Sequence, residues 1–389
     1  MKPVYLYVVP WFPSGNMWRG GFFLDAAKAL VRNGRYDVRV MSGEAGEDYE
    51  VDGIKVFRFG TCKIGCSDHL EFLTDWMKIR KFFRKLRRMG LAPKDVAVCH
   101  VHLLERYAIY AAWMKRRNPS CFTIAHHHWS GMLVEGGSTW NISILRRYQQ
   151  HRLRADFETV DAHVFCSEMS MRSFQGRSLG IDQDRSHVFY NGIDTNVFSP
   201  KEKRHQDDGF RIGCVANFVS SKSQITLLEA FCQVKEKMPR ARVVLVGSGE
   251  CLELCKTFVT EHSLGDRVDF LSEVNHWDIP SFYRSLDLYV LPSYYPEAFN
   301  CSLIEAWACG VPCVTTKEIS FKEVLPKEEW DKWLFPARDV KALADKLVWA
   351  YNARPGRQPL LRNLDIDAIT DELIEWIDTA RGGAGCVKF

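Results

Sequence analysis

DLYVLPSYYPEAFNCSLIEAWACGVPCVTT, residues 287–316, carries the pattern that decides the fold. An apolar run over 287–291 predicts a buried strand, and the apolar spacing over 302–309 predicts a helix that stops at Gly310. A second apolar run at 312–315 predicts the next strand. A strand, a helix and a strand in this order predict a βαβ unit with parallel strands.

The same alternation extends along the chain on both sides of this segment. Strands are predicted at 4–9, 37–41, 54–59, 96–101, 121–125, 162–166, 187–190, 211–215, 242–246 and 267–270. The charged segment SPKEKRHQDDG at 199–209 separates two such series. We therefore expect an α/β protein with two Rossmann-like, doubly wound domains that face each other across a cleft, residues 1–198 and 199–365. A last amphipathic helix at about 366–380 is expected to pack back on the first domain.

Composition narrows the class of protein. The net charge is +4, but residues 1–200 carry 28 Lys and Arg against 20 Asp and Glu, which favours an anionic partner for the first half. Thirteen scattered cysteines indicate reduced thiols rather than a disulfide scaffold. Because no run of eighteen apolar residues exists, no membrane span is predicted. We expect a cytoplasmic protein, with peripheral contact to the inner face of the membrane as an open alternative.

Two glutamates of the opening segment are candidates for chemistry. Glu297 lies in the loop before the predicted helix, and Glu305 lies within it. A structural alternative exists for Glu305, because Ser302 and Glu305 have the spacing of a capping box. That alternative does not explain Glu297. The backbone N–H groups of Asn300, Cys301 and Ser302 would open the helix, and a helix N-terminus attracts phosphate.

At these residues the sequence resembles a known family. Residues 292–316 are similar to the E-x7-E motif of the retaining GT-B glycosyltransferases of family GT4, with Glu297 and Glu305 at the glutamate positions. Ala298 and Asn300 stand where the family usually has glycines. Further segments resemble family motifs in the family's order: Arg19–Gly21, NGIDTNVF at 191–198, VANFVSSKSQITLLEAF at 215–231 and LVGSGE at 245–250. The resemblance covers nearly the whole chain.

The resemblance implies a GT-B architecture and a glycosyltransferase. Such an enzyme would move a sugar from a nucleotide-sugar donor to a glycan or lipid-linked acceptor with retention of anomeric configuration, in bacterial cell-surface polysaccharide or glycolipid synthesis. The alternatives are a sugar-nucleotide epimerase on the same scaffold and a non-catalytic module that binds sugar nucleotides or membrane. Neither a cofactor nor a metal is expected, because the two Asp-x-Asp pairs, at 182–184 and 365–367, are typical of caps.

The resemblance also implies roles for single residues. Glu297 would bind hydroxyl groups of the donor sugar, and Glu305 would bind the ribose. Lys222 would hold the leaving diphosphate, where a cation has a large electrostatic effect. Asn217 occupies the place, five residues earlier, where the family usually has an arginine. The candidate donor-binding residues are Gly20, Gly21, Asn217, Gly247, Phe299, Asn300, Cys301 and Glu305.

A histidine-rich run, AHHHWSG at 125–131, follows a predicted strand. One ion could hardly bind three adjacent histidines, because neighbouring residues point in different directions. Family members place an active-site histidine here, and the H-W-S-G run assigns that role to His128. His127 is the second candidate, and Trp129 is a further candidate on the acceptor side. The pair His100 and His102 is interpreted as structural, with side chains on opposite faces of its strand.

The basic segment KIRKFFRKLRR at 78–88 carries seven basic residues and no acid. One interpretation is a solvated helix with a buried apolar stripe. The other is docking to an anionic membrane through a face that includes Lys78, Lys81, Lys85 and Arg88. Nucleic acid is not expected as a partner, because no other feature supports it.

Overall fold

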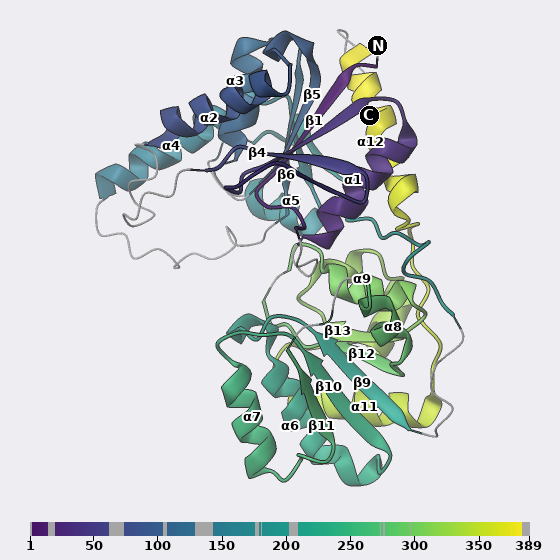
Figure 1. Cartoon of the computed structure of the whole chain (residues 1–389). Coiled ribbons are helices and arrows are strands. Elements are labelled where there is room, and N and C mark those ends of the chain that lie inside the picture. The colour runs from purple at the N-terminus through teal and green to yellow at the C-terminus, as the bar shows by residue number, and fades with distance from the viewer. Residues whose placement is uncertain are drawn as a thin grey trace. The chain divides into compact units, whose positions relative to one another are not determined.

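The chain forms two α/β units (Figure 1). The computed structural model describes residues 2–14, 20–61, 74–103, 107–128, 143–175, 179, 181–201, 209–272, 274, 277–295 and 297–382. Unit 1 comprises Met1–Gly192 and Leu364–Phe389, and unit 2 comprises Ile193–Asn363. The charged segment 199–209, which the sequence suggested as the boundary, begins a few residues after this division.

Unit 1 contains a sheet of eight strands in the order β3-β4-β2-β1-β5-β6-β7-β8. All neighbouring strands are parallel except β3 and β4. The strands are β1 (Val4–Val9), β2 (Asp37–Ser42), β3 (Tyr49–Val51), β4 (Ile54–Arg58), β5 (Val96–Leu103), β6 (Phe122–His127), β7 (Ala162–Phe165) and β8 (Ser186–Val188). The helices are α1 (Gly21–Asn33), α2 (Asp75–Arg88), α3 (Ala108–Arg117), α4 (Ser143–Thr159), α5 (Glu168–Gln175) and α12 (Ile366–Gly382).

The central strand β1 shows how the sequence builds the two faces of this sheet. All six of its residues are buried, as expected for a parallel strand covered on both sides. Val4, Leu6 and Val8 pack in the core formed with α2, α3, α4 and α5. Tyr5, Tyr7 and Val9 pack in the second core, with α1 and α12 (Figure 1).

Helix α12 begins at a cap and packs against α1 and the sheet of unit 1. The Asp365 carboxylate accepts hydrogen bonds from the backbone N–H groups of Asp367 and Ala368 at 3.0 and 3.2 Å. Leu373, Ile374 and Ile377 enter the core that contains Tyr5 and Tyr7. The last segment of the chain is therefore part of the first unit.

We expect Ile377→Ala to destabilise unit 1 by about 2–5 kcal/mol, the usual cost of truncating a fully buried isoleucine. Ile377 is 0% exposed. Hydrogen exchange in α1 and α12, measured by mass spectrometry, would accelerate accordingly. Glu375→Ala, on the exposed side of the same helix, should change stability by less than about 0.5 kcal/mol. Equal effects of the two substitutions would show that α12 is not docked through this stripe.

Unit 2 contains a six-stranded, wholly parallel sheet in the order β11-β10-β9-β12-β13-β14. The strands are β9 (Phe210–Val215), β10 (Ala241–Val246), β11 (Val268–Leu271), β12 (Leu288–Leu291), β13 (Cys313–Thr316) and β14 (Leu334–Phe335). The helices are α6 (Gln224–Val234), α7 (Leu252–Glu261), α8 (Ile279–Arg284), α9 (Cys301–Ala308), α10 (Trp330–Trp333) and α11 (Val340–Ala353). Residues of α6, α7 and α11 share one core with the sheet.

Two short strands, β3 and β14, were not predicted from the sequence. Strands of two or three residues exist through their pairing with a neighbour and leave little periodic pattern. Among the helices that the structure describes, none combines the length and the apolar character needed to cross a membrane.

Candidate functional site

The carboxyl end of the unit 2 sheet positions the predicted donor-binding residues. The strand order runs from β9 to β10 on one side and to β12 on the other, so the order reverses at β9. Ligands of such sheets bind outside the carboxyl ends of the strands at this reversal. Lys222 ends the short 3-10 helix η5 (Ser220–Lys222) after β9, and Glu297 lies in the loop after β12.

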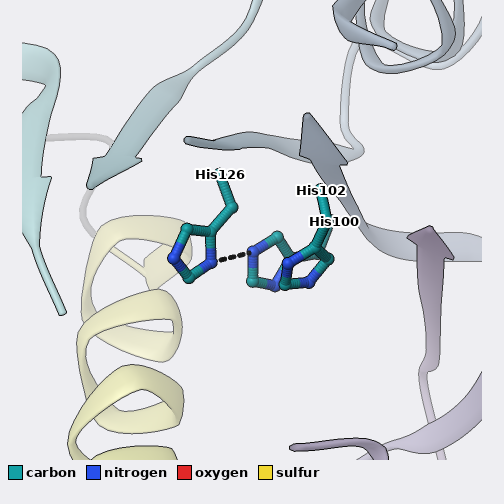
Figure 2. Close-up of side chains that lie close together, drawn as sticks. All are labelled: His100, His102 and His126. Atoms are coloured by element: carbon teal, nitrogen blue, oxygen red, sulfur yellow. Dashed lines mark hydrogen bonds between the residues drawn. The ribbon is translucent and has the colours of Figure 1, made fainter. Parts of the chain in front are cut away.

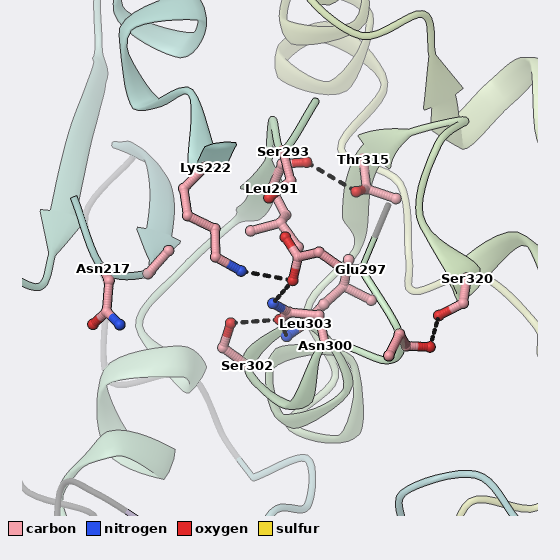
Figure 3. Close-up of polar contacts among 12 residues, drawn as sticks. Asn217, Lys222, Leu291, Ser293, Glu297, Asn300, Ser302, Leu303, Thr315 and Ser320 are labelled. Carbon is pink, nitrogen blue, oxygen red and sulfur yellow. Dashed lines mark hydrogen bonds and ion pairs between the residues drawn. The ribbon is translucent and has the colours of Figure 1, made fainter. Parts of the chain in front are cut away.

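Lys222, Glu297 and Asn300 form one contacting group (Figure 3). The Lys222 Nζ lies 2.6 Å from Oε2 of Glu297, and the Asn300 amide donates to the same oxygen at 2.6 Å. The other oxygen, Oε1 of Glu297, is buried and has no hydrogen-bond partner among the described residues. The structure thus brings together two of the predicted catalytic residues and leaves an acceptor oxygen available to a ligand.

The start of α9 holds this group in place. The Asn300 Oδ1 accepts from the Leu303 N–H at 3.0 Å and from the Ser302 hydroxyl at 2.7 Å. The Ser302 hydroxyl also lies 2.7 Å from the Tyr289 hydroxyl and 2.9 Å from the Val215 carbonyl. Asn300 is therefore the cap of α9. Through the Ser302 hydroxyl it is also connected to Val215 of β9 and Tyr289 of β12.

The capping box considered for Ser302 and Glu305 is not formed. Glu305 instead accepts a hydrogen bond from the Tyr283 hydroxyl at 2.8 Å. Burial, and then the Glu305 charge, raise the pKa of Tyr283 well above its usual value, so the phenol stays protonated and donates. Tyr283 was not predicted, because only the packing of α8 beside α9 places it there.

Gly247 lets two loops of unit 2 approach each other closely. It follows β10 with φ +141°, and a Cβ at this position would lie 2.2 Å from the Ala216 carbonyl oxygen. No side chain fits there without displacing the backbone. The glycine therefore fixes the path of the β9 loop that leads to Lys222.

Asn217 lies apart from the Lys222 group (Figure 3). Its backbone carbonyl accepts from the Gln224 amide at 3.0 Å, which anchors the start of the loop. Phe299 is buried, and Cys301 is a partly exposed thiol at the first position of α9. Ser293, which the sequence analysis did not single out, has a buried hydroxyl with no partner within the described part of the chain.

In unit 1, the start of α1, which follows the glycine turn, lies beside His128 at the carboxyl end of the sheet. Gly20 has φ +90°, and a Cβ there would lie 2.9 Å from the Trp11 ring. This turn starts α1 at Gly21 and brings the ring of Phe22 to 5.4 Å from the ring of His128. A structural reason for Gly20 is therefore present in the structure.

His128 follows β6 and has a neutral ring. Its Nε2 lies 2.6 Å from Nδ1 of His102, and burial lowers the pKa of His128 to about 4. A neutral imidazole can donate or accept a hydrogen bond, but it supplies no charge at neutral pH. Trp129 lies outside the described residues.

His127 points to the opposite face of the sheet from His128. Its Nε2 lies 3.1 Å from Nδ1 of His163, and its ring stacks on Phe165 at 4.5 Å. His127 is 2% exposed and belongs to the surroundings of the α2–α5 core. The structure does not bring the two histidine candidates together.

The expectation that His100 and His102 face opposite ways is wrong. Residues two apart on a strand share a face, and the two rings stack at 4.3 Å between centroids. Both lie on the face that carries Tyr5 and Tyr7.

Comparison with known proteins matches both units to glycosyltransferase families. Residues 22–197 match the family described as Glycosyltransferase Family 4. Residues 197–364 match the family described as Glycosyl transferases group 1. The chain belongs to the GT4-type glycosyltransferases. The family predicted from the E-x7-E segment is confirmed.

Relatives of this glycosyltransferase span most of its length at low identity. A UDP-Gal:α-D-GlcNAc-diphosphoundecaprenol α-1,3-galactosyltransferase of Escherichia coli is 22% identical over 82% of this chain and 81% of its own. An uncharacterized glycosyltransferase of Methanocaldococcus jannaschii is 25% identical over 83% of this chain and 81% of its own.

Solved structures support the fold. Sucrose-phosphate synthase from Thermosynechococcus elongatus has a TM-score of 0.75 at 17% identity and covers 99% of this chain and 100% of its own. Anabaena HepE, solved with UDP and glucose, has a TM-score of 0.70 at 17% identity, with 97% and 100% covered. The predicted fold class, two Rossmann-like units of the GT-B type, is confirmed.

Proposed function

We propose that this glycosyltransferase moves a sugar from a nucleotide-sugar donor to a glycan or lipid-linked acceptor, with retention of anomeric configuration and without a metal ion on the diphosphate. The bond between the anomeric carbon and the diphosphate breaks. The acceptor hydroxyl oxygen takes its place on the carbon, and the hydroxyl proton leaves with the diphosphate. The proposed setting is bacterial cell-surface polysaccharide or glycolipid synthesis, in the cytoplasm or at the inner face of the membrane.

The observation that carries this proposal is the group of Lys222, Glu297 and Asn300 at the reversal of strand order. Lys222 is the cation for the leaving diphosphate, and it exchanges its contact with Glu297 for one with phosphate when the donor binds. Oε1 of Glu297, which has no partner among the described residues, then accepts from hydroxyl groups of the sugar, while Oε2 keeps its hydrogen bond from Asn300. Glu305, held by Tyr283, is the proposed contact of the ribose.

His128 is the proposed unit 1 residue next to the transferred sugar. Because its ring is neutral, it acts by hydrogen bonding and not as a cation. Because Asn217 stands in the place of an arginine, Lys222 and backbone N–H groups must stabilise more of the negative charge on the leaving diphosphate. The proposal of a metal-free donor site rests instead on the Asp-x-Asp pairs, of which Asp365 caps α12 through the N–H groups of Asp367 and Ala368.

Names of relatives support the acceptor class. The E. coli relative is named for a UDP-Gal donor and a diphosphoundecaprenol-linked acceptor. A second E. coli relative, 26% identical over 44% of this chain and 43% of its own, is a putative colanic acid biosynthesis glycosyltransferase. Anabaena HepE has also been solved with UDP-glucose.

A thermal-shift screen with UDP-, GDP-, ADP- and CMP-sugars tests the donor proposal. A ligand at a hundred times its Kd stabilises the folded state by about 2.7 kcal/mol, which is readily seen as a rise in Tm. We expect one nucleotide class to raise the Tm of the wild-type protein and to lose most of that effect in Lys222→Ala. No response to any of the four classes would contradict the proposal.

Peripheral membrane contact is proposed through α2, on a face that shares only Arg88 with the face suggested by the sequence. Lys78 is only 6% exposed, and Lys85 pairs with Asp48 at 2.7 Å, so these lysines do not form an open basic face. The apolar side chains of α2 pack against the sheet and α3. This packing determines which side of α2 faces solvent. The exposed stripe consists of Trp76, Arg80, Arg84, Arg87 and Arg88.

We expect replacement of Arg80, Arg84, Arg87 and Arg88 by Gln to weaken binding to anionic vesicles. Each basic residue near such a surface contributes about 1 kcal/mol, so the four together predict roughly 10²–10³-fold weaker binding at low salt. The matched control replaces four exposed basic residues of unit 2 by Gln: Lys237, Arg240, Arg242 and Lys256. Sedimentation with phosphatidylserine vesicles measures both. Equal loss in the control would mean that net charge, and not this stripe, drives binding.

A further inference from the structure

Three buried histidines of unit 1 gather at one point of the sheet (Figure 2). His100 and His102 come from β5 and His126 from the neighbouring strand β6. They are 1%, 3% and 7% exposed. One ring nitrogen of each lies within 4.8 Å of the others. The proposed transfer reaction uses none of the three.

His100 and His126 are joined by a hydrogen bond, whose proton a metal ion bound to the same two nitrogens would replace (Figure 2). Nε2 of His100 lies 3.1 Å from Nδ1 of His126, and the two ring planes differ by 3°. The lone pair of an imidazole nitrogen lies in the ring plane, so an ion that lies to one side of the line between the two nitrogens, in the common plane of the rings, could bind both. Two nitrogens at Zn–N distances of about 2.0–2.1 Å in a tetrahedral site are roughly 3.3 Å apart.

His102 supplies the third nitrogen. Its ring lies 4.3 Å from that of His100 and 4.9 Å from that of His126, between centroids. Its Nε2 is buried and has no hydrogen-bond partner among the described residues. Leaving such an atom unsatisfied costs about 1–3 kcal/mol. A turn of this ring toward the other two would let an ion satisfy it.

The surroundings resemble the second shell of a histidine metal site. Metal-bound histidines usually hold their other ring nitrogen in a hydrogen bond that fixes the tautomer. The Tyr5 hydroxyl lies 2.5 Å from Nδ1 of His100, and Nε2 of His128 lies 2.6 Å from Nδ1 of His102.

We propose that His100, His102 and His126 form a binding site for a divalent transition metal ion, with Zn²⁺ as the best-suited ion. Imidazole ligands suit zinc, and three of them leave one position of a tetrahedron for a further ligand. The ion would join β5 to β6. The inference concerns unit 1 alone and does not depend on the proposed transfer reaction, and it departs from the sequence-based expectation of no metal.

Metal titration of the full chain tests this site. After dialysis against a chelator, we expect the protein to take up about one Co²⁺ or Zn²⁺ per chain. The Co²⁺ form should show the visible bands of a tetrahedral site and no thiolate charge-transfer band, although the chain has thirteen cysteines. His102→Gln and His126→Gln should each weaken binding by about tenfold or more. Added Zn²⁺ should raise the Tm of the wild-type protein and not that of these variants.

Two control variants and one direct measurement decide the outcome. His127→Gln alters a histidine that is equally buried but on the opposite face, and His262→Gln alters an exposed one in unit 2; both should retain binding. If the ligand variants do not fold, X-ray absorption of the zinc-loaded wild-type protein still decides, with three imidazole nitrogens at about 2.0–2.1 Å expected. No bound metal, sulfur ligands, or unchanged affinity in His102→Gln would overturn the proposal.

Discussion

Glu297→Gln lowers the rate of sugar transfer by about 10²–10³-fold, because a charged group aimed at the reacting sugar is replaced by a neutral one. The substitution keeps the shape of the side chain. The amide oxygen of the new residue can still accept from Lys222 and Asn300, so hydrogen bonds can replace the two contacts that the Glu297 carboxylate makes at 2.6 Å. The expected loss is therefore mainly in kcat, with little change in thermal stability. Steady-state kinetics with the donor found in the thermal-shift screen measures it.

The control for Glu297 lies in the same unit. Glu253 pairs with Lys256 at 2.8 Å on the exposed surface of α7, with a carboxylate side chain that is 79% exposed. Glu253→Gln makes the same chemical change in an exposed ion pair outside the donor site and should leave kcat unchanged. Full activity in Glu297→Gln would remove this residue from the site.

Lys222→Ala should be the most damaging single change in the donor site. A unit charge about 4 Å from another contributes roughly 4 kcal/mol at an effective dielectric constant near 20, which corresponds to about 10³-fold in rate. No compensating arginine stands at position 217. We expect the loss in kcat/KM for the nucleotide sugar, together with a loss of nucleotide diphosphate binding measured by calorimetry.

One further variant at position 222 tests the role of charge, and one at another exposed lysine serves as the control. Lys222→Arg keeps the charge and should recover part of the lost activity, whereas Lys256→Ala removes an exposed lysine of the same unit and should change nothing. Because Lys222 and Glu297 contact each other, their effects should not add in the double variant. Wild-type nucleotide binding in Lys222→Ala would contradict the role given to the lysine.

Much of the fold follows from local sequence patterns. β1 and β12 are continuous apolar runs, and a strand buried on both faces needs such a run. The stripe of α12 identifies its buried side, since Leu373, Ile374 and Ile377 lie on one face of a 3.6-residue period. These features depend on residues close together in the chain.

The contacts within the site depend on residues that are far apart in the chain. Ser302 and Asn300 are both suitable caps. Asn300 is the cap in the structure because its amide N–H donates to Glu297 and its amide oxygen accepts from the Leu303 N–H. Tyr283 meets Glu305 only because α8 packs beside α9. Neither choice has a periodic signal in the sequence.

The histidines show the same limit in unit 1. His102 and His128 are separated by 26 positions, and they meet because β5 pairs with β6 in a register that places His102 opposite His126. The side of α2 that faces solvent is likewise set by tertiary packing, through Phe82 stacking on Tyr110 at 5.0 Å. The composition indicated a basic helix. Tertiary packing determines that its arginines are exposed and that Lys78 and Lys85 are covered.

The most direct test of the account follows a labelled sugar. The nucleotide sugar selected by the thermal-shift screen, carrying ¹³C at the anomeric carbon, is incubated with the enzyme and a polyprenyl-diphosphate-linked glycan, and the labelled carbon is followed by NMR. We expect the label to move into a new glycosidic linkage with its original anomeric configuration, and Glu297→Gln to slow this transfer by about 10²-fold or more. A label that stays in an epimerised nucleotide sugar, with no need for an acceptor, would contradict it.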